Sequence, residues 1–246
     1  NDFMIDEWCG DSAGRLIPLC VVPLWDPQLA AAEVRRNAAR GCRAVAFSEL
    51  PSWLGLPSIH TRHWDPFFQA CEETSTVLAM HIGSGTKTVT TSPDAPTVVA
   101  ANLIACNSVA SMVDWLFSGV FDRFPGIQLL YAESQIGWIP YFVERADDTW
   151  QTHQWAQGEE RSQRPPSDYY REHISACFFK DTVGIDLLDR IGEDNVLFET
   201  DYPHQDGTFP RSKQVAEELF GHLPQPTINK IARGNAIKLL GLDFEP

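Results

Sequence analysis

Length, composition and charge exclude several classes of protein. The chain has 246 residues, 43% of them hydrophobic and 21% charged, which is typical of a globular domain with one sizeable core. With 33 acidic and 19 basic residues, its formal net charge of -14 opposes binding to nucleic acid or to an anionic lipid surface.

No run of apolar residues approaches the roughly 18 that cross a membrane, so we expect no membrane partner. The six cysteines are scattered without a CxxC pair, and most lie in apolar stretches such as IPLCVV. This pattern favours buried free thiols and a cytoplasmic location over a disulfide framework.

In chain order, an amphipathic stretch opens the sequence (NDFMIDEWCG), and short apolar runs then alternate with longer amphipathic ones. Such alternation is typical of β-α units on a parallel sheet. We expect six strands, at residues 15–24, 43–49, 77–83, 127–133, 174–179 and 195–201. Their nearly continuous hydrophobicity suits strands that are covered on both faces.

Helical patterns fill the intervals between these strands. We expect helices at residues 27–40, 65–75, 97–124, 137–155, 183–192, 211–221 and 227–241. The polar segment 157–168 is predicted to be a surface loop, because the β-α alternation resumes after it. We therefore expect residues 1–246 to form a single α/β domain.

Ionisable residues follow the carboxyl ends of the predicted strands, where barrel enzymes of the β-α type place their catalytic groups. In chain order these residues are Asp26, Glu49, His81, Glu133, Lys180 with Asp181, and Asp201. Imidazole and carboxylate groups on one rim are the ligands that a divalent cation such as Zn2+ or Mn2+ requires. We predict His81 and Asp201 to be metal ligands.

The other histidines are assigned by their places in the pattern. His204, in the loop after Asp201, is a candidate for substrate contact and proton transfer, with ordinary loop hydrogen bonding as the alternative. His60 and His63 are expected in a loop, and a metal role for them is the weaker interpretation. His173 precedes its strand and is predicted to be structural.

Four blocks of sequence resemble consecutive landmarks of the amidohydrolase-related family, whose members include decarboxylases of muconate-type and aromatic acids. The blocks are LAMHIGSG, IQLLYAESQIGWIPYFVERADD, IGEDNVLFETDYPH and ARGNAIKLLGL. The resemblance implies a (β/α)8 TIM barrel with one catalytic divalent metal. In that family a histidine ends strand five and an aspartate ends strand eight, and these positions fall on His81 and Asp201.

Two features depart from the family pattern. The position that ends strand six, often histidine in the decarboxylases, is Glu133 here, and no HxH motif occurs in the sequence. Counting back from Asp201, the first predicted strand corresponds to strand three. We therefore expect a barrel that lacks about the first two β-α units.

Three functions remain open from the sequence. The first expectation is a metal-dependent hydrolase of a small carbonyl or carboxylate compound, in which Asp201, Glu133 and His204 are catalytic and Lys180 and His204 bind substrate. The first alternative is a non-oxidative decarboxylase of an aromatic or muconate-type acid. The second is an inactive subunit that pairs with another chain through open strand edges. We expect a homodimer.

Overall fold

The computed structural model contains a curved parallel sheet with helices around it. It describes residues 1–158 and 162–244. The strands are β1 (Leu19–Cys20), β2 (Ala44–Phe47), β3 (Val77–His81), β4 (Leu129–Ala132), β5 (Ile174–Phe178) and β6 (Val196–Phe198). They lie in sequence order and every neighbouring pair is parallel. This confirms the α/β class and all six predicted strands, although the ladder uses only two residues of the first.

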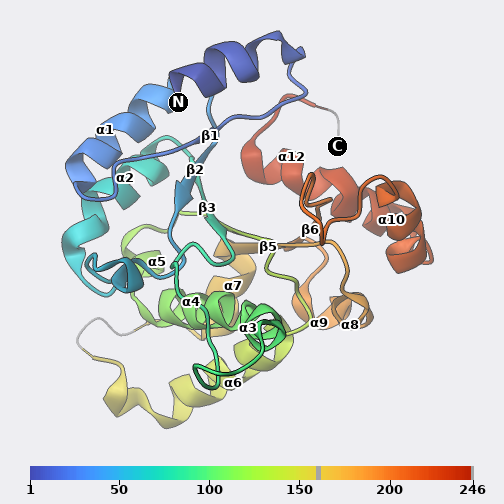
Figure 1. Ribbon diagram of the computed structural model, residues 1–246. Helices are drawn as coiled ribbons and strands as arrows, with labels where there is room; N and C mark the ends of the chain where they lie inside the picture. The colour runs from blue at the N-terminus through green and yellow to red at the C-terminus, as the bar shows by residue number, and fades with distance from the viewer. Residues whose placement is uncertain (159–161, 245–246) are drawn as a thin grey trace.

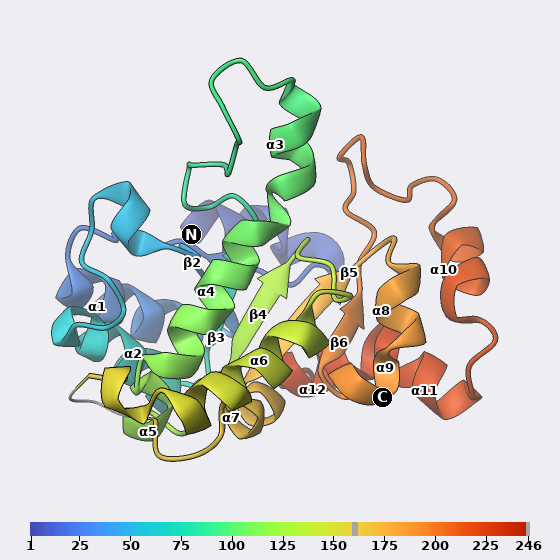
Figure 2. The same ribbon diagram turned by 90° about the horizontal axis from the view of Figure 1, so that it is seen from below.

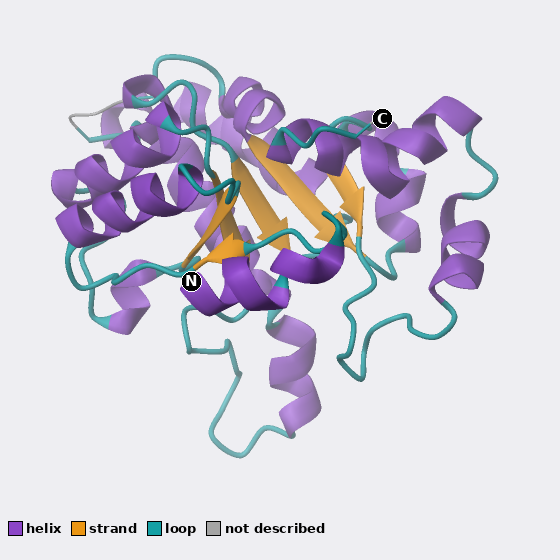
Figure 3. Ribbon diagram, turned by 90° about the horizontal axis from the view of Figure 1, so that it is seen from above, coloured by secondary structure: helices purple, strands orange, loops and turns teal. Residues whose placement is uncertain are grey.

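The helices lie outside the strands (Figures 1 and 3). They are α1 (Pro27–Ala38), α2 (Asp65–Glu73), α3 (Thr97–Leu103), α4 (Ala105–Phe117), α5 (Val120–Arg123), α6 (Ile139–Thr152), α7 (Pro166–His173), α8 (Thr182–Asp186), α9 (Leu188–Ile191), α10 (Ser212–Phe220), α11 (Gln225–Asn229) and α12 (Asn235–Leu240). Short π or 3-10 segments are η1 (Phe3–Trp8), η2 (Gly10–Ser12), η3 (Pro51–Leu54), η4 (Arg62–Trp64), η5 (Gln154–Ala156) and η6 (Lys230–Gly234).

Several predicted helices are divided in the structure. The predicted helix 97–124 is three helices, with a break at Ile104 between α3 and α4 and a left-handed Gly119 (φ 68°) before α5. The predicted loop 157–168 is wrong at its end, because α7 begins at Pro166; residues 159–161 of it lie outside the described residues. The opening amphipathic stretch is a π-helix rather than an α-helix.

The core lies between the sheet and its helical cover. Phe47 of β2 packs edge-on against Trp64, with ring centroids 5.1 Å apart, and stacks on Phe67 of α2 at 5.3 Å. Phe68 of α2 contacts Trp115 of α4 at 5.3 Å. Because these aromatic side chains are fully or almost fully buried, they fix α2 and α4 against β2. The cysteines are free thiols, and all except Cys106 are buried.

The sheet has two edges, since β1 pairs only with β2 and β6 only with β5 among the described residues. Leu19 and Val21 at the first edge are 38% and 64% exposed. With Ala46, Ala79, His81 and other, mostly apolar, residues they line a hollow of about 250 Å3. Within the described residues the six strands therefore form an open parallel sheet, and this hollow borders its first edge.

Residues 97–117, which make up α3 and α4, are long and apolar enough to cross a membrane by length and composition alone. This differs from the expectation that no segment would be long and apolar enough to cross a membrane. Core helices of water-soluble proteins pass the same test, and in α4 the side chains of Met112, Trp115 and Leu116 are buried in the core. Helix α3 instead projects beyond the carboxyl end of β4 (Figure 2).

Candidate metal centre and substrate pocket

Three side chains that could hold a metal ion converge at the carboxyl ends of β4 and β6. They are Glu133, Asp201 and His204, each of which offers one ligand atom, and these atoms all lie within 4.8 Å of one another. The Asp201 side chain is only 6% exposed, and its Oδ2 lies 2.7 Å from His204 Nδ1. Two carboxylates and an imidazole are suitable donors for Mn2+ or Zn2+, so the residues present fit such an ion.

The backbone at this centre adopts a conformation that is rare for residues with side chains. Glu133 has φ 59° and Asp201 has φ 52°, both in the left-handed region. A non-glycine residue there raises the energy of the folded state by about 1 kcal/mol or more. Such conformations cluster at functional sites, where they direct side chains that a regular strand would direct elsewhere.

His81, at the end of β3, is joined to the centre through Glu133. Its Nε2 lies 2.7 Å from Glu133 Oε1, and its Nδ1 lies 2.8 Å from the carbonyl oxygen of Ile82. When Nδ1–H donates to this carbonyl, Nε2 of the neutral ring is an acceptor, so its contact with Glu133 is a hydrogen bond when either His81 or Glu133 carries an additional proton. His81 lies outside the three-residue cluster itself, so its role as a ligand with Asp201 stays a prediction.

Crowded carboxylates perturb the acid–base properties of the centre. Burial, together with Asp201, raises the pKa of Glu133. Burial also raises the pKa of Glu199 to about 7, and the neighbouring Glu133 and Asp201 carboxylates contribute. Burial lowers the pKa of His81, but the Ile82 carbonyl and Glu133 outweigh it, so the pKa is raised overall. The hydrogen bond that His204 donates to the Asp201 carboxylate raises the pKa of His204.

Glu199 is the residue that the sequence analysis missed. Its Oε1 accepts a hydrogen bond of 2.8 Å from the backbone N–H of Glu133, so it stabilises the left-handed turn there. A signal was available in the sequence, because Glu199 lies at the carboxyl end of a predicted strand, where functional carboxylates were expected.

Not every ionisable residue after a strand belongs to the centre. Asp26 caps α1, its Oδ1 accepting from the N–H groups of Gln28 and Leu29. Asp181 caps α8 through Gly184 N–H and also accepts from the turn after β4. The expectation that all strand ends supply the same functional rim is therefore wrong for these two residues, which stabilise helix starts and turns.

Glu49 and Lys180 have defined partners near the centre. Glu49 is 1% exposed, and its carboxyl contacts Ser108 Oγ at 2.5 Å and Gly83 N–H at 2.8 Å, tying α4 to the turn after β3. Lys180 Nζ donates to the backbone oxygen of Asp206 at 2.6 Å. Its predicted contact with substrate stays a prediction.

His60 lies in a turn, as predicted, whereas His63 lies in the 3-10 segment η4 rather than in a loop. His60 Nε2 lies 3.2 Å from Asp114 Oδ1, and His63 packs against Trp64. His173 is 2% exposed and stacks on Phe121 with ring centroids 4.3 Å apart, at the opposite end of the strands from the centre. The structural role predicted for His173 is confirmed.

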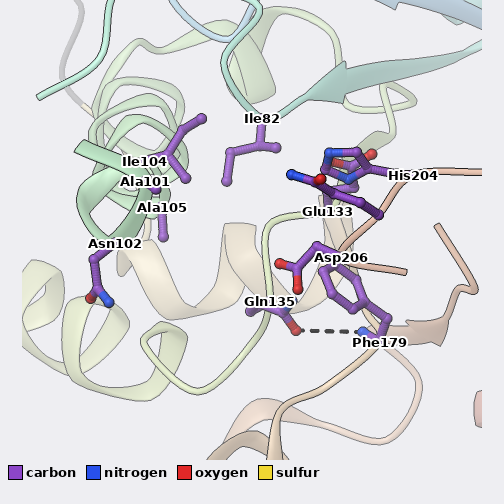
Figure 4. Close-up of a pocket in the computed structure, with 11 residues that line it drawn as sticks. Ile82, Ala101, Asn102, Ile104, Ala105, Glu133, Gln135, Phe179, His204 and Asp206 are labelled. Carbon is purple, nitrogen blue, oxygen red and sulfur yellow. Dashed lines mark hydrogen bonds between the residues drawn. The ribbon is translucent and has the colours of Figure 1, made fainter. Parts of the chain in front are cut away.

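A pocket of about 720 Å3 opens beside the metal centre (Figure 4). One wall carries Glu133 and His204, and the opposite wall is formed by α3 and α4. Its lining residues are Ile82, Ala101, Asn102, Ile104, Ala105, Glu133, Gln135, Phe179, His204, Gln205 and Asp206. The volume and the mixture of apolar surface with a few polar groups suit a small organic ligand.

Fold and site together define a class: an α/β protein with side chains suited to hold a metal ion at its strand ends, beside a pocket. Comparison of the sequence identifies the family. The chain matches the amidohydrolase family (Amidohydro_2) over residues 1–242 and belongs to it.

Two relatives are γ-resorcylate decarboxylases. The enzyme of Rhizobium sp. (strain MTP-10005) is 24% identical over 265 aligned residues, and that of Rhodococcus jostii (strain RHA1) is 26% identical over 267. Each alignment covers 99% of this chain and 75% of the relative.

Solved structures share the fold. A 5-carboxyvanillate decarboxylase from Sphingomonas paucimobilis superposes with a TM-score of 0.80 at 19% identity, covering 98% of this chain and 71% of that one. A dihydroxybenzoic acid decarboxylase from Polaromonas sp. JS666, solved with bound manganese and the inhibitor 2-nitroresorcinol, gives 0.77 at 19%, covering 99% and 74%. The comparisons favour the decarboxylase alternative over the hydrolase expected first.

Proposed function

We propose that this chain is a metal-dependent, non-oxidative decarboxylase of a small aromatic carboxylic acid, acting in the cytoplasm. The observation that supports it best is the convergence of Glu133, Asp201 and His204 beside a 720 Å3 pocket, in a chain whose relatives include γ-resorcylate decarboxylases. Manganese is the proposed ion, because a structural neighbour was solved with it.

Each residue has a proposed part in the reaction. Asp201 and His81 would hold the ion. Glu133 would lie beside both ligands, since its carboxylate is within hydrogen-bond distance of His81. When bound, the ion supplies positive charge that orients the substrate and offsets its negative charge. His204 lines the pocket and is oriented by Asp201. It would carry the proton that replaces the departing carboxyl group on the ring.

The test measures metal and product together. The protein expressed from its complete gene is purified with added Mn2+, its metal content is measured, and release of CO2 from a panel of hydroxylated benzoic acids is followed. Asp201→Asn should lose both metal and activity. His204→Asn leaves Asp201, Glu133 and His81 to hold the ion, so it should retain bound metal and lose at least about 100-fold in rate, as removal of a general acid does. Hydrolysis of carbonyl substrates without release of CO2 would contradict the decarboxylase proposal and support a hydrolase instead.

A second candidate is an inactive subunit. It is favoured by the edges of β1 and β6, which pair with no further strand of the described residues, and by the exposed side chains of Leu19 and Val21. Such edges and apolar side chains bind partner strands. Fewer than about 0.1 metal ions per chain, no turnover and a stable oligomer would support this candidate. The expected homodimer stays a prediction that the same sizing measurement tests.

A further inference from the structure

The pocket has polar groups on its two facing walls. Glu133 and His204 lie on one side, and Asn102 of α3 lies on the other (Figure 4). Among the described residues that line the pocket, Asn102 is the only polar one from α3 and α4, where it accompanies Ile104 and two alanines. Ile82, Gln135 and Phe179 also line the pocket, and Gln135 Oε1 already accepts from Phe179 N–H. A ligand that fits this distribution presents one polar group to Glu133 and His204 and a second one to Asn102.

The far wall carries no positive charge. Among the described residues that line the pocket there is no lysine or arginine. The nearby Lys180 ammonium already donates to the backbone of Asp206 and lies 3.6 Å from its carboxylate. A second carboxylate at the Asn102 end of the ligand would therefore have no cationic partner.

Asn102 offers a donor and an acceptor without charge. It is exposed on α3, and its side chain has no hydrogen-bond partner within residues 1–158 and 162–244 that would hold it away from a ligand. An amide of this kind can bond a phenol hydroxyl in either direction. The position is unusual because α3 projects from the rim (Figure 2), so a single helix sets this side of the pocket.

We propose that Asn102 is a specificity-determining residue, which selects ring acids whose second polar group is an uncharged hydroxyl and rejects those with a second carboxylate. The inference rests on the proposed function, because it takes the first carboxylate to lie at the metal centre. It adds which substituent the far end of the substrate carries.

Equilibrium binding tests the inference without turnover. Calorimetry on the Mn2+-loaded protein compares benzoate with meta- and para-hydroxybenzoate, and with isophthalate and terephthalate. Wild type should bind the better hydroxybenzoate about fivefold more tightly than benzoate, the value of one neutral hydrogen bond. The dicarboxylates should bind more weakly than benzoate.

Two substitutions and a control separate the possible causes. Asn102→Leu should abolish the preference for hydroxyl while leaving benzoate affinity within about twofold. Asn102→Arg should bind one dicarboxylate about tenfold more tightly, through a charge-assisted pair. Val98→Arg adds the same charge on α3 at a 73%-exposed position that does not line the pocket, and should leave the order of ligands as in wild type. Circular dichroism establishes that each variant is folded.

The outcomes distinguish this inference from the proposed function. If no ring acid binds the loaded wild type, the proposed function fails, and the inference fails with it. If the acids bind but Asn102→Leu keeps the hydroxyl preference, or Val98→Arg matches Asn102→Arg, only the role of Asn102 is overturned.

Discussion

Asp181 links the metal-centre turn to the start of α8, and its removal is the most informative test of the fold around the site. Its Oδ2 accepts from the N–H groups of Ile136 and Gly137 at 2.7 and 2.6 Å, and its Oδ1 accepts from Gly184 N–H at 2.8 Å. Ile136 and Gly184 are buried, so water cannot replace the carboxylate at these donors. Each stranded buried donor costs about 1–3 kcal/mol.

We expect Asp181→Ala to lower the free energy of unfolding by about 3–4 kcal/mol, taking each of the three donors near the low end of that range. Asp26→Ala is the matched control, because Asp26 also caps a helix but bonds two exposed N–H groups. Its loss should be about 1 kcal/mol. Urea unfolding, monitored by tryptophan fluorescence, measures the free energy of unfolding of both variants. The dependence of this free energy on urea concentration should be the same in both.

The turn that Asp181 holds follows directly from Glu133, so the same variant should bind Mn2+ more weakly, whereas Asp26→Ala should bind it as wild type does. Equal losses of stability in the two variants would refute the reasoning, since buried and exposed caps would then be equivalent. A stable Asp181→Ala with unchanged metal affinity would refute it as well.

Three further predictions concern other parts of the chain. Burial lowers the pKa of His173 below its usual 6.5, so the unfolded chain binds the proton first as the pH falls. The free energy of unfolding should therefore decrease from about pH 7 downward. In His173→Asn the midpoint of urea unfolding should decrease less over the same pH range. A Cβ at Gly207 would lie 2.5 Å from the backbone oxygen of Asp201. Because this clash would displace Asp201, Gly207→Ala should weaken Mn2+ binding at least about tenfold. Gly10→Ala is the control and should bind Mn2+ as wild type does, because the nearest atom to its Cβ would lie at 3.6 Å. Burial raises the pKa of the Glu49 carboxyl, and Glu49→Gln preserves its shape and both hydrogen bonds. The melting temperature of Glu49→Gln should therefore stay near that of wild type. Glu49→Ala should lower the free energy of unfolding by about 3 kcal/mol.

The order of elements could be predicted from the sequence because hydrophobic periodicity reports it directly. Each of the six apolar runs contains a strand, and Glu133, Asp201 and His204 converge as their places after strands suggested. Helix α7 was missed because it is short and polar. Its buried face is carried by Tyr169, Tyr170 and His173, too few residues for a periodic signal.

Backbone conformation explains most of what the sequence could not predict. A carboxylate after a strand serves equally well as a ligand or as a helix cap, and only the following turn decides. For Asp26 a signal existed, since the Pro27 that follows is typical of a first helical position. For Glu133 no signal existed, because left-handed φ angles are usually marked by glycine, and otherwise by asparagine or aspartate.

Those left-handed residues have a consequence for how the protein responds to selection. Replacing Asp201 or Glu133 with glycine relieves an unfavourable φ and removes crowded negative charge, so the loss of the site should make the fold more stable. A library screened only for heat resistance would therefore accumulate inactive chains. Retention of both carboxylates in a natural population would thus be a sign that their chemistry is under selection.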